Sequence, residues 1–334
     1  MGVQIAEILP KREIEIKELV GKKIAIDAYN WLYQFLSIIR QPDGTPLMDS
    51  KGRITSHLSG IFYRSSKLME VGLKLVYVFD GEPPSFKYVT EERSEFRKES
   101  ERKWKEALAK GEMEQAKMHA KASSRLTDEM IKQSKDLLSY MGIPVVQALS
   151  EGEAQCAHLC KKGLVFSTAS QDSDSLLFGS PRLVRNLSIT GRRKMPKRDE
   201  YYELKPEMIE LNKTLESLGL KREQLIIMAL LVGSDYNPGI KGIGPKKALG
   251  LIKKEKNLKN VLKAIEWNHE VSAEKIYDFY LNPPAKDAKL EFRPVQGEKI
   301  LKLMVDEHEF SQERVEKVIK TLSESKQSTL GSYF

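Results

Sequence analysis

The sequence has few cysteines, no long hydrophobic run and no secretory leader pattern. Only two of its 334 residues are cysteines, Cys156 and Cys160, which excludes a disulfide framework and favours a reducing intracellular compartment. The most hydrophobic run, Leu225–Val232, is far too short to span a bilayer. The N-terminus lacks the charged start and apolar core of a secretory signal. We therefore expect a soluble, cytoplasmic protein with no membrane partner.

Acidic residues are fewer than basic residues. The chain has 47 Asp and Glu against 55 Lys and Arg, so its formal net charge is +8, which weakly favours a polyanionic partner such as nucleic acid. With 40% hydrophobic residues the chain can bury a core, which excludes a disordered or fibrous protein. The length suits about two domains, or one large α/β unit with an appendage.

Short apolar runs alternate with amphipathic patterns in the first half of the chain. Strands are predicted at Lys22–Ile26, Leu75–Phe79 and Leu164–Phe166, and helices at Trp31–Ile39, Leu58–Val71, Asp128–Met141 and Glu153–Lys162. This alternation predicts an α/β fold with a mostly parallel central sheet and helices on both faces. After Leu204 the pattern is helical, and its first predicted helix is Pro206–Leu218.

Acidic residues follow each predicted strand. Because ligands bind beyond the carboxyl ends of parallel strands, Asp27, Asp80 and the Asp172/Asp174 pair should converge on one crevice. Crowded carboxylates repel one another unless cations neutralise them, and oxygen ligands without His or Cys select Mg²⁺ or Mn²⁺. Two such ions suit in-line displacement at a phosphodiester. The acidic candidates are Asp27, Asp80, Glu151, Glu153, Asp172, Asp174 and Asp235.

Several of these acids also have a local structural explanation. Ser150 and Glu153 fit a helix capping box, Asp172 and Asp174 fit a helix N-cap, and Asp235 fits the turn that follows it. The position of all seven acids at the ends of elements favours one shared site over separate local roles.

A glycine-rich segment, Ile240–Ala248, lies between two helical patterns. Gly242 and Gly244 allow backbone N–H groups to approach a phosphate, and Lys246 and Lys247 supply positive charge. The segment resembles a helix-hairpin-helix motif, which grips the DNA backbone without reading its sequence. A plain tight turn between packed helices is the alternative.

The segment Glu91–Glu106 is unusually charged. Twelve of its 16 residues are charged, six acidic and six basic. Phe96 and Trp104 form too narrow an apolar stripe for a helix that faces a core. We expect this helix to stand away from the body or to bridge over something, and a solvated surface helix is the alternative.

Six short motifs occur in the order typical of one nuclease family. They are Ala25–Ala28, Val78–Pro84, Glu151–Ala154, Gln171–Asp174, Gly233–Tyr236 and Gly242–Pro245. Together they span nearly the whole chain and resemble the motifs of archaeal-type flap endonucleases, which are structure-specific 5′ nucleases with a PIN-like fold. The resemblance implies Mg²⁺-dependent cleavage of branched DNA at 5′ flaps, with 5′-3′ exonuclease activity. The implied roles are lagging-strand maturation in DNA replication and long-patch base excision repair.

The resemblance also implies roles for particular side chains. Asp27, Asp80, Glu151 and Glu153 match the ligands of a first Mg²⁺, and Asp172, Asp174 and Asp235 match those of a second, with Mn²⁺ able to substitute. Lys87 matches a catalytic lysine at the foot of a helical arch. Arg93 matches the second arch cation if one residue is missing between them, and Arg97 is the alternative. DNA contacts are implied for Tyr33, which stacks on a base, and for Arg40, Arg64, Glu151, Gly233, Asp235, Gly242, Gly244, Lys246 and Lys247. A K⁺ ion is expected on the backbone of the hairpin motif, at Gly239 and Ile240.

The C-terminal residues are similar to a clamp-interacting box. Its members are Gln327, Leu330, Tyr333 and Phe334. A one-turn helix with this spacing places the apolar side chains on one side, where they can fill a groove of a DNA sliding clamp. We expect a monomer until the clamp binds, in an archaeal cell and associated with the nucleoid.

The predicted organisation has five parts. They are an N-terminal nuclease region (1–98), a helical arch (99–125), an internal nuclease region with the hairpin motif (126–258), a C-terminal helical region (259–322) and a flexible tail with the clamp box (323–334). The competing hypothesis is a non-catalytic, clamp-tethered DNA-binding adaptor, whose signature is missing carboxylates. All seven are present. A third hypothesis is a related nuclease that cuts bubbles or junctions, or an RNA-directed enzyme. The bubble-cutting relatives carry a longer insertion than Glu91–Arg125.

Overall fold

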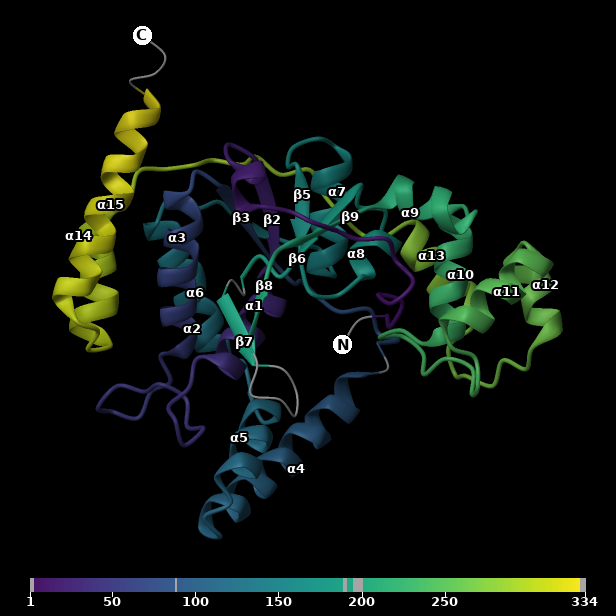
Figure 1. The fold of residues 1–334 in the computed structure, drawn as a ribbon, viewed down its shortest axis with the longest axis horizontal. Coiled ribbons are helices and arrows are strands. Elements are labelled where there is room, and N and C mark those ends of the chain that lie inside the picture. Colours follow the sequence, from purple (N-terminus) through teal and green to yellow (C-terminus); the bar gives the residue numbers. More distant parts are fainter. Residues whose placement is uncertain (1–2, 88, 189–190, 195–200, 331–334) are drawn as a thin grey trace.

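The computed structural model describes residues 3–87, 89–188, 191–194 and 201–330, and at 89–94, 191–194, 201–203 and 325–330 it describes the backbone alone. A central sheet lies between two groups of helices, α14 and α15 on one side and α10 to α13 on the other (Figure 1). Helices α4 and α5 project away from this body (Figure 1). None of the helices in the described ranges is long and apolar enough to cross a membrane.

The central sheet confirms the predicted α/β fold class. It contains β1 (Arg12–Glu13), β2 (Lys23–Asp27), β3 (Lys74–Phe79), β4 (Val145–Gln147), β5 (Ser167–Ala169), β6 (Arg182–Arg185) and β9 (Glu207–Glu210). The strand order is β1-β9-β6-β5-β2-β3-β4. The neighbours from β6 to β4 pair in parallel, whereas β9 pairs antiparallel with both β6 and β1. A separate hairpin joins β7 (Gly191–Lys194) and β8 (Tyr201–Leu204).

The helices cover both faces of the sheet. Those that precede β4 in the chain are η1 (Ile16–Leu19), α1 (Ala28–Ile38), α2 (Ser56–Ser59), the π-helix η2 (Gly60–Arg64), α3 (Ser65–Glu70), α4 (Val89–Ala109), α5 (Met113–Ala122) and α6 (Asp128–Tyr140). Those that follow are α7 (Gly152–Lys161), α8 (Asp174–Leu177), α9 (Leu211–Leu218), α10 (Arg222–Val232), α11 (Pro245–Glu255), α12 (Leu258–Ala264), α13 (Ala273–Leu281), α14 (Gly297–Leu301), the π-helix η3 (Lys302–Glu307) and α15 (Gln312–Leu330).

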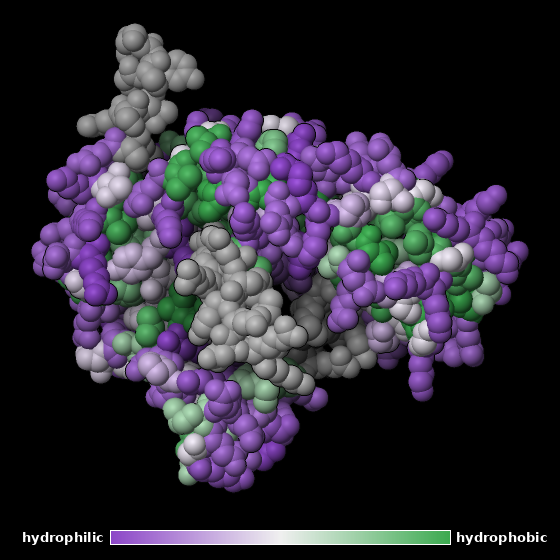
Figure 2. All heavy atoms as spheres, viewed as in Figure 1, coloured by the Kyte–Doolittle hydropathy of each residue, from purple (hydrophilic) through white to green (hydrophobic). Residues whose placement is uncertain are grey.

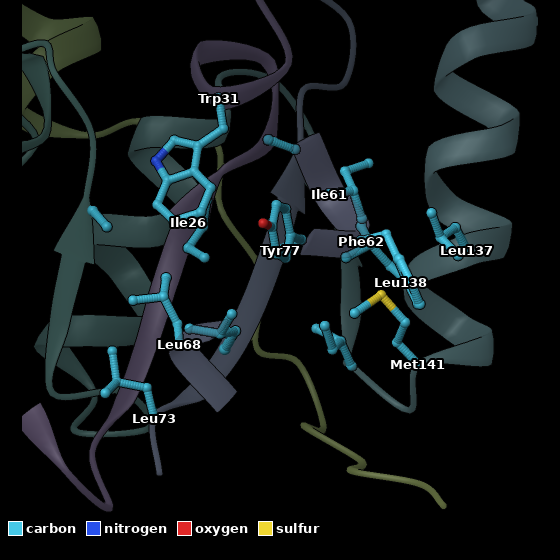
Figure 3. Close-up of a cluster of buried hydrophobic side chains, with 14 of the residues drawn as sticks. Ile26, Trp31, Ile61, Phe62, Leu68, Leu73, Tyr77, Leu137, Leu138 and Met141 are labelled. Atoms are coloured by element: carbon cyan, nitrogen blue, oxygen red, sulfur yellow. The ribbon is translucent and has the colours of Figure 1, made fainter. Parts of the chain in front are cut away.

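Successive side chains of each strand point to opposite faces of the sheet and so contribute to two hydrophobic layers. Ile26 of β2 and Tyr77 of β3 pack with α1, η2 and α6, and Trp31 meets the Tyr77 ring edge-on with centroids 5.7 Å apart (Figure 3). Ala25 and Val76, on the opposite face, pack against Cys156 and other residues of α7. Both faces of these strands are therefore buried, which explains their nearly continuous apolar sequence.

Two of the predicted elements are wrong, one strand in its position and one helix in the type of its first residues. The third strand is β5, three residues after the predicted Leu164–Phe166, because the N–H groups of Leu164 and Val165 still donate to the carbonyl of Leu159 at the end of α7. The predicted helix Pro206–Leu218 begins with strand β9, because residues 207–210 complete the edge of the sheet beside β6, and only Leu211–Leu218 are helical.

Helices α4 and α5 form the projecting hairpin, called the arch below. Both helices bury small side chains, Ser100 and Ala107 in α4 and Ala116 and Ala120 in α5. Most of its visible surface is hydrophilic (Figure 2). Arg102 lies 2.6 Å from Glu99 and 2.5 Å from Glu106 on the same helix, so part of the balanced charge is used in pairs within α4.

Helix α15 extends further than the sequence indicates. It continues to Leu330, through the start of the segment predicted as a flexible tail. The hydroxyl groups of Thr321 and Ser323 donate to backbone carbonyls four residues earlier, so these polar side chains are accommodated within the helix.

Candidate active site

One cavity of about 570 Å³ collects all seven predicted carboxylates. It lies beyond the carboxyl ends of β2 and β3 and extends toward the arch, where Tyr33, Arg97 and Lys121 line it. The basic side chains in its wall are Lys87, Arg97 and Lys121. Acidic groups therefore outnumber basic groups around a single solvent-filled space.

The ends of two neighbouring strands supply Asp27 and Asp80. Asp27 is the last residue of β2, and its carboxylate accepts a 3.1 Å hydrogen bond from the N–H of Asn30 in the first turn of α1. Asp80 follows β3 and accepts a 2.7 Å bond from the N–H of Gly152. A Cβ at Gly152 would lie 2.5 Å from Asp80 Oδ1, so glycine permits this close approach. Because β2 and β3 pair in parallel, their acids meet at one edge of the sheet.

The start of α7 supplies Glu151 and Glu153, and the predicted capping box is not formed. Glu151 is the N-cap residue and makes no side-chain capping bond. Glu153 is partly buried in the cavity wall, and its buried Oε1 has no hydrogen-bond partner within the described part of the chain. The Glu153 carboxylate therefore lines the cavity and does not cap the N-terminus of α7.

The other three acids come from the loop after β5 and from the turn after α10. The N-cap of α8 is Ser173, which makes no side-chain cap bond, so Asp174 is not a cap and instead accepts a 2.9 Å bond from the N–H of Val3. The turn around Asp235 is closed by other side chains, because the Ser234 hydroxyl bonds to the Asn237 amide oxygen at 2.8 Å. The helix-capping explanation of Asp174 therefore does not hold here.

Burial and mutual repulsion shift the ionisation of the cluster. Burial, reinforced by Glu151, raises the pKa of Asp80 to about 6, and burial with the nearby Asp235 raises the pKa of Asp174 to about 7. Burial also raises the pKa of Asp27 and of Glu153 well above their ordinary values, and the strongest repulsion comes from Asp80 on Asp27 and from Asp174 on Glu153. The cluster therefore needs positive charge in order to be fully ionised at neutral pH.

Lys87 supplies part of that positive charge. Its Nζ lies 2.9 and 2.8 Å from the two oxygens of Glu151, and both side chains are largely buried. Burial acts to lower the pKa of Lys87, but the carboxylate of Glu151 outweighs it, and the pKa is raised. Lys87 is therefore protonated at neutral pH and is held at the rim of the acidic cavity.

The donor set fits a hard divalent cation. No three His, Cys, Asp or Glu side chains in the described ranges are arranged closely enough to hold a metal ion ready-made. The chemistry of the wall nevertheless matches one, because seven carboxylates face three basic groups and one buried carboxylate oxygen of Glu153 lacks a donor. A cation bound among these side chains would offset their repulsion and would give the unpaired Glu153 oxygen a partner.

The predicted DNA contacts of the first region differ in their surroundings. Tyr33 is half-buried and lines the cavity, so it is not a core aromatic like its neighbour Trp31. Arg40 is committed to protein groups: its Nε donates to the Leu36 carbonyl, and its two terminal nitrogens donate to Gly44 and Ser124, at 2.7 to 2.8 Å. Arg64 is half-buried in η2 and does not line the cavity.

The glycines in and just before the hairpin motif adopt backbone conformations or close contacts that other residues would not tolerate, or begin a helix. Gly233 has φ +110, and a Cβ there would lie 2.9 Å from the Pro238 carbonyl oxygen. Gly242 also has a positive φ, Gly244 is the N-cap of α11, and Pro245 begins that helix. Lys246 and Lys247 are exposed at the start of α11.

Five other predicted positions lie wholly or partly outside what the structure describes. They are the side chains of Arg93, Gln327 and Leu330, and the residues Tyr333 and Phe334 are outside it altogether.

Sequence reasoning missed Asn30, which joins three parts of the site. Its amide nitrogen donates to Asp172 at 3.1 Å, and its amide oxygen accepts a 3.3 Å bond from the N–H of Gln171. Its position three residues after Asp27, in the first turn of α1, was the available signal. The backbone contact of Val3 with Asp174 has no signal in the sequence.

Comparison with known proteins assigns the chain to a family. The XPG N-terminal domain model matches residues 1–102, and the XPG I-region model matches residues 142–235. Flap endonuclease 1 of Pyrococcus abyssi is 56% identical over 341 aligned residues, which cover 100% of this chain and 98% of the relative. The chain belongs to the flap endonuclease family. Flap endonuclease 1 of Archaeoglobus fulgidus is 53% identical, and the match covers both chains completely.

Solved structures agree with this family membership. The flap endonuclease-1 of Methanococcus jannaschii has a TM-score of 0.78 and 41% identity, and the match covers 98% of this chain and 100% of the other. The catalytic core of Rad2 in complex with a DNA substrate has a TM-score of 0.69 and 27% identity, with 95% and 97% covered. The predicted family and nuclease fold are therefore confirmed.

Proposed function

We propose that this chain is a divalent-metal-dependent, structure-specific endonuclease that hydrolyses DNA phosphodiesters at 5′ flaps, with a secondary 5′-3′ exonuclease activity. The observation that carries the proposal is the convergence of seven carboxylates on one cavity in a member of the flap endonuclease family. DNA as the substrate is supported by the Rad2 catalytic core, which is similar to this chain and is solved with a DNA substrate.

The carboxylates would hold two Mg²⁺ ions, with Asp27, Asp80, Glu151 and Glu153 around one and Asp172, Asp174 and Asp235 around the other. When bound, the ions supply Lewis-acid polarisation of the scissile phosphate and neutralise the acidic wall. Raised pKa values of Asp80 and Asp174 support this assignment, because a cation removes the repulsion that raises them.

The protein's own groups position the DNA. Lys87 exchanges its bond with Glu151 for the phosphate and stabilises the charge that develops there, with Arg93 as the second arch cation. Tyr33 stacks on the base next to the scissile phosphate. Lys246 and Lys247, beside the N-terminus of α11, bind the phosphates of the duplex, with a K⁺ ion on the backbone at Gly239 and Ile240.

The cellular roles proposed are lagging-strand maturation and long-patch base excision repair, in association with the nucleoid. The C-terminal box, Gln327, Leu330, Tyr333 and Phe334, would bind a DNA sliding clamp. The extension of α15 to Leu330 supports this proposal because it carries the first part of the box beyond the helical body (Figure 1).

The test is cleavage of a 5′-labelled double-flap DNA with Mg²⁺ or with EDTA, beside single-stranded and nicked DNA of the same sequence. We expect a flap-sized product in Mg²⁺ and none in EDTA. The flapped DNA should be cleaved faster than the single-stranded and nicked DNA. Asp174→Ala should bind this DNA without cleaving it, whereas Glu216→Gln, an exposed change on α9, should cleave like the wild type. Tight binding by the wild type without product, with Mn²⁺ as well, would support the adaptor hypothesis instead.

A further inference from the structure

Arg97 of the arch covers the aromatic ring of Tyr33. The guanidinium carbon lies 4.5 Å from the ring centroid, within the range of a cation–π contact. Both side chains are half-buried and line the cavity that contains the carboxylates. A planar guanidinium stacks on a ring much as a base does, so Arg97 takes up a face that Tyr33 would offer to DNA.

The other leg of the arch is docked on the same helix. The Ser37 hydroxyl donates to the Lys121 carbonyl at 3.3 Å, and the Arg40 guanidinium donates to the Ser124 hydroxyl at 2.8 Å. Tyr33 and Ser37 are four residues apart on one face of α1, and Arg40 lies two residues beyond the end of that helix. The arch therefore meets this face at both of its ends, and the second contact holds the first in register.

The cavity supplies a reason for Arg97 to move. It is continuous from the carboxylates to Arg97 and Lys121 on the arch side. A single strand that leaves the carboxylate end along this cavity brings phosphates to these two cations. Guanidinium groups bind phosphate through paired, charge-assisted hydrogen bonds, which are stronger than a cation–π contact. DNA that has no unpaired 5′ strand offers no such phosphate there.

We propose that Arg97 is a specificity-determining residue, which keeps Tyr33 covered until the phosphates of an unpaired 5′ strand draw its guanidinium away. The inference rests on the proposed function, because it assumes that Tyr33 stacks on a base of the substrate. Flapped DNA then gains the Tyr33 stack and a phosphate contact with Arg97, whereas flapless DNA must displace Arg97 without compensation. Selectivity for flaps arises from this difference.

The experiment measures directly how far a DNA base stacks on Tyr33. EDTA and saturating DNA are used so that neither metal binding nor DNA affinity affects the result. Duplexes carry 2-aminopurine at the terminal base that would meet Tyr33, with or without a 5′ flap, and Tyr33→Leu sets the unstacked fluorescence. In the wild type we expect quenching with flapped DNA and little with flapless DNA. In Arg97→Gln, the stacking constant on flapless DNA should rise about fivefold, the equivalent of about 1 kcal/mol.

Arg102→Gln is the matched control. It removes the same charge from α4, where Arg102 pairs with Glu99 and Glu106 and does not line the cavity, so its stacking should equal that of the wild type. Arg97→Ala, which cannot bond to neighbours, should repeat the Arg97→Gln result. The inference is overturned if base stacking on flapless DNA is the same in Arg97→Gln and Arg102→Gln. It is also overturned if Arg97→Gln and Arg97→Ala lose stacking to the same extent on flapped and on flapless DNA. Failure of the proposed function would differ, because the wild type would then cleave no flapped DNA in Mg²⁺.

Discussion

Neutralising Asp174 should stabilise the protein when no divalent cation is present. Its pKa is raised from an ordinary 3.8 to about 7 by burial and by Asp235 and Asp172. Because the folded-state value is the higher one, the folded protein holds this proton more tightly, and stability falls as pH rises from about 4 to about 7. The shift of about 3 pKa units corresponds to about 4 kcal/mol of folding stability. At pH 8 this stability is lost completely, because Asp174 is then ionised in the folded protein.

Asp174→Asn removes that charge and keeps the shape. Its amide oxygen can still accept the N–H of Val3, and its NH₂ can donate to the carboxylates that repel Asp174. In EDTA at pH 8 we expect the free energy of unfolding to rise by at most about 4 kcal/mol, because neighbouring carboxylates relax as well. The gain should vanish near pH 4.

Urea unfolding followed by circular dichroism, at pH 8 and at pH 4, checks this expectation. Glu216→Gln, an exposed carboxylate on α9, controls for the loss of one negative charge and should leave the midpoint unchanged. Adding Mg²⁺ should stabilise the wild type more than Asp174→Asn. A variant that is less stable than the wild type in EDTA at pH 8 would refute the argument that the cluster is electrostatically strained.

Three further predictions follow from local environments. Burial lowers the pKa of His57 from 6.5 to about 4, so its contribution to stability is present above pH 6.5 and is lost as pH falls toward 4; His57→Gln should flatten the pH dependence of unfolding by about 3 kcal/mol over that range. Lys87→Met should lower kcat on flapped DNA by about 10² with little change in KM, since the charge it supplies acts on the transition state; a rise in KM alone would contradict this role. Gly239→Ala should destabilise the protein by at least about 1–3 kcal/mol in thermal melts, because φ is +80 and a Cβ would lie 2.5 Å from a carbonyl oxygen. Gly250→Ala, inside α11 with open space at its Cβ, should instead be neutral or stabilising.

The sequence predicts best where one local pattern decides the structure. Strands β2 and β3 lie within one residue of their predicted bounds, because continuous apolar runs bounded by acids have no competing interpretation. The position of Asp27 and Asp80 at the carboxyl ends of parallel strands then follows from topology alone. The same reasoning brings Asp172 and Asp174, which follow β5, to the same cavity, whereas Glu151, Glu153 and Asp235 reach it from the start of α7 and from the turn after α10.

It fails where tertiary context outweighs the local pattern. Strand β5 has the small residues Ser167, Thr168 and Ala169 because it lies between two other strands and is fully buried, while the more apolar residues before it complete the turn after α7. Strand β9 exists because β6 and β1 flank it, which no local pattern reveals.

Side-chain commitments are also invisible in the sequence. Arg40 donates hydrogen bonds to Leu36, Gly44 and Ser124, so in this structure its guanidinium joins the segment after α1 to the segment after α5 and is not free for DNA. Asn30 was missed because an asparagine in a first helical turn has no catalytic pattern of its own.

The central claim is that the acidic cavity binds two divalent cations. Its most direct test is the stoichiometry of Mn²⁺ binding, followed by electron paramagnetic resonance of the free ion, for the wild type, Asp174→Asn and Glu216→Gln. We predict two Mn²⁺ per chain for the wild type and for Glu216→Gln, and fewer or weaker sites for Asp174→Asn. Binding that is weak and identical in all three proteins would contradict the claim and would leave the cluster without its proposed role.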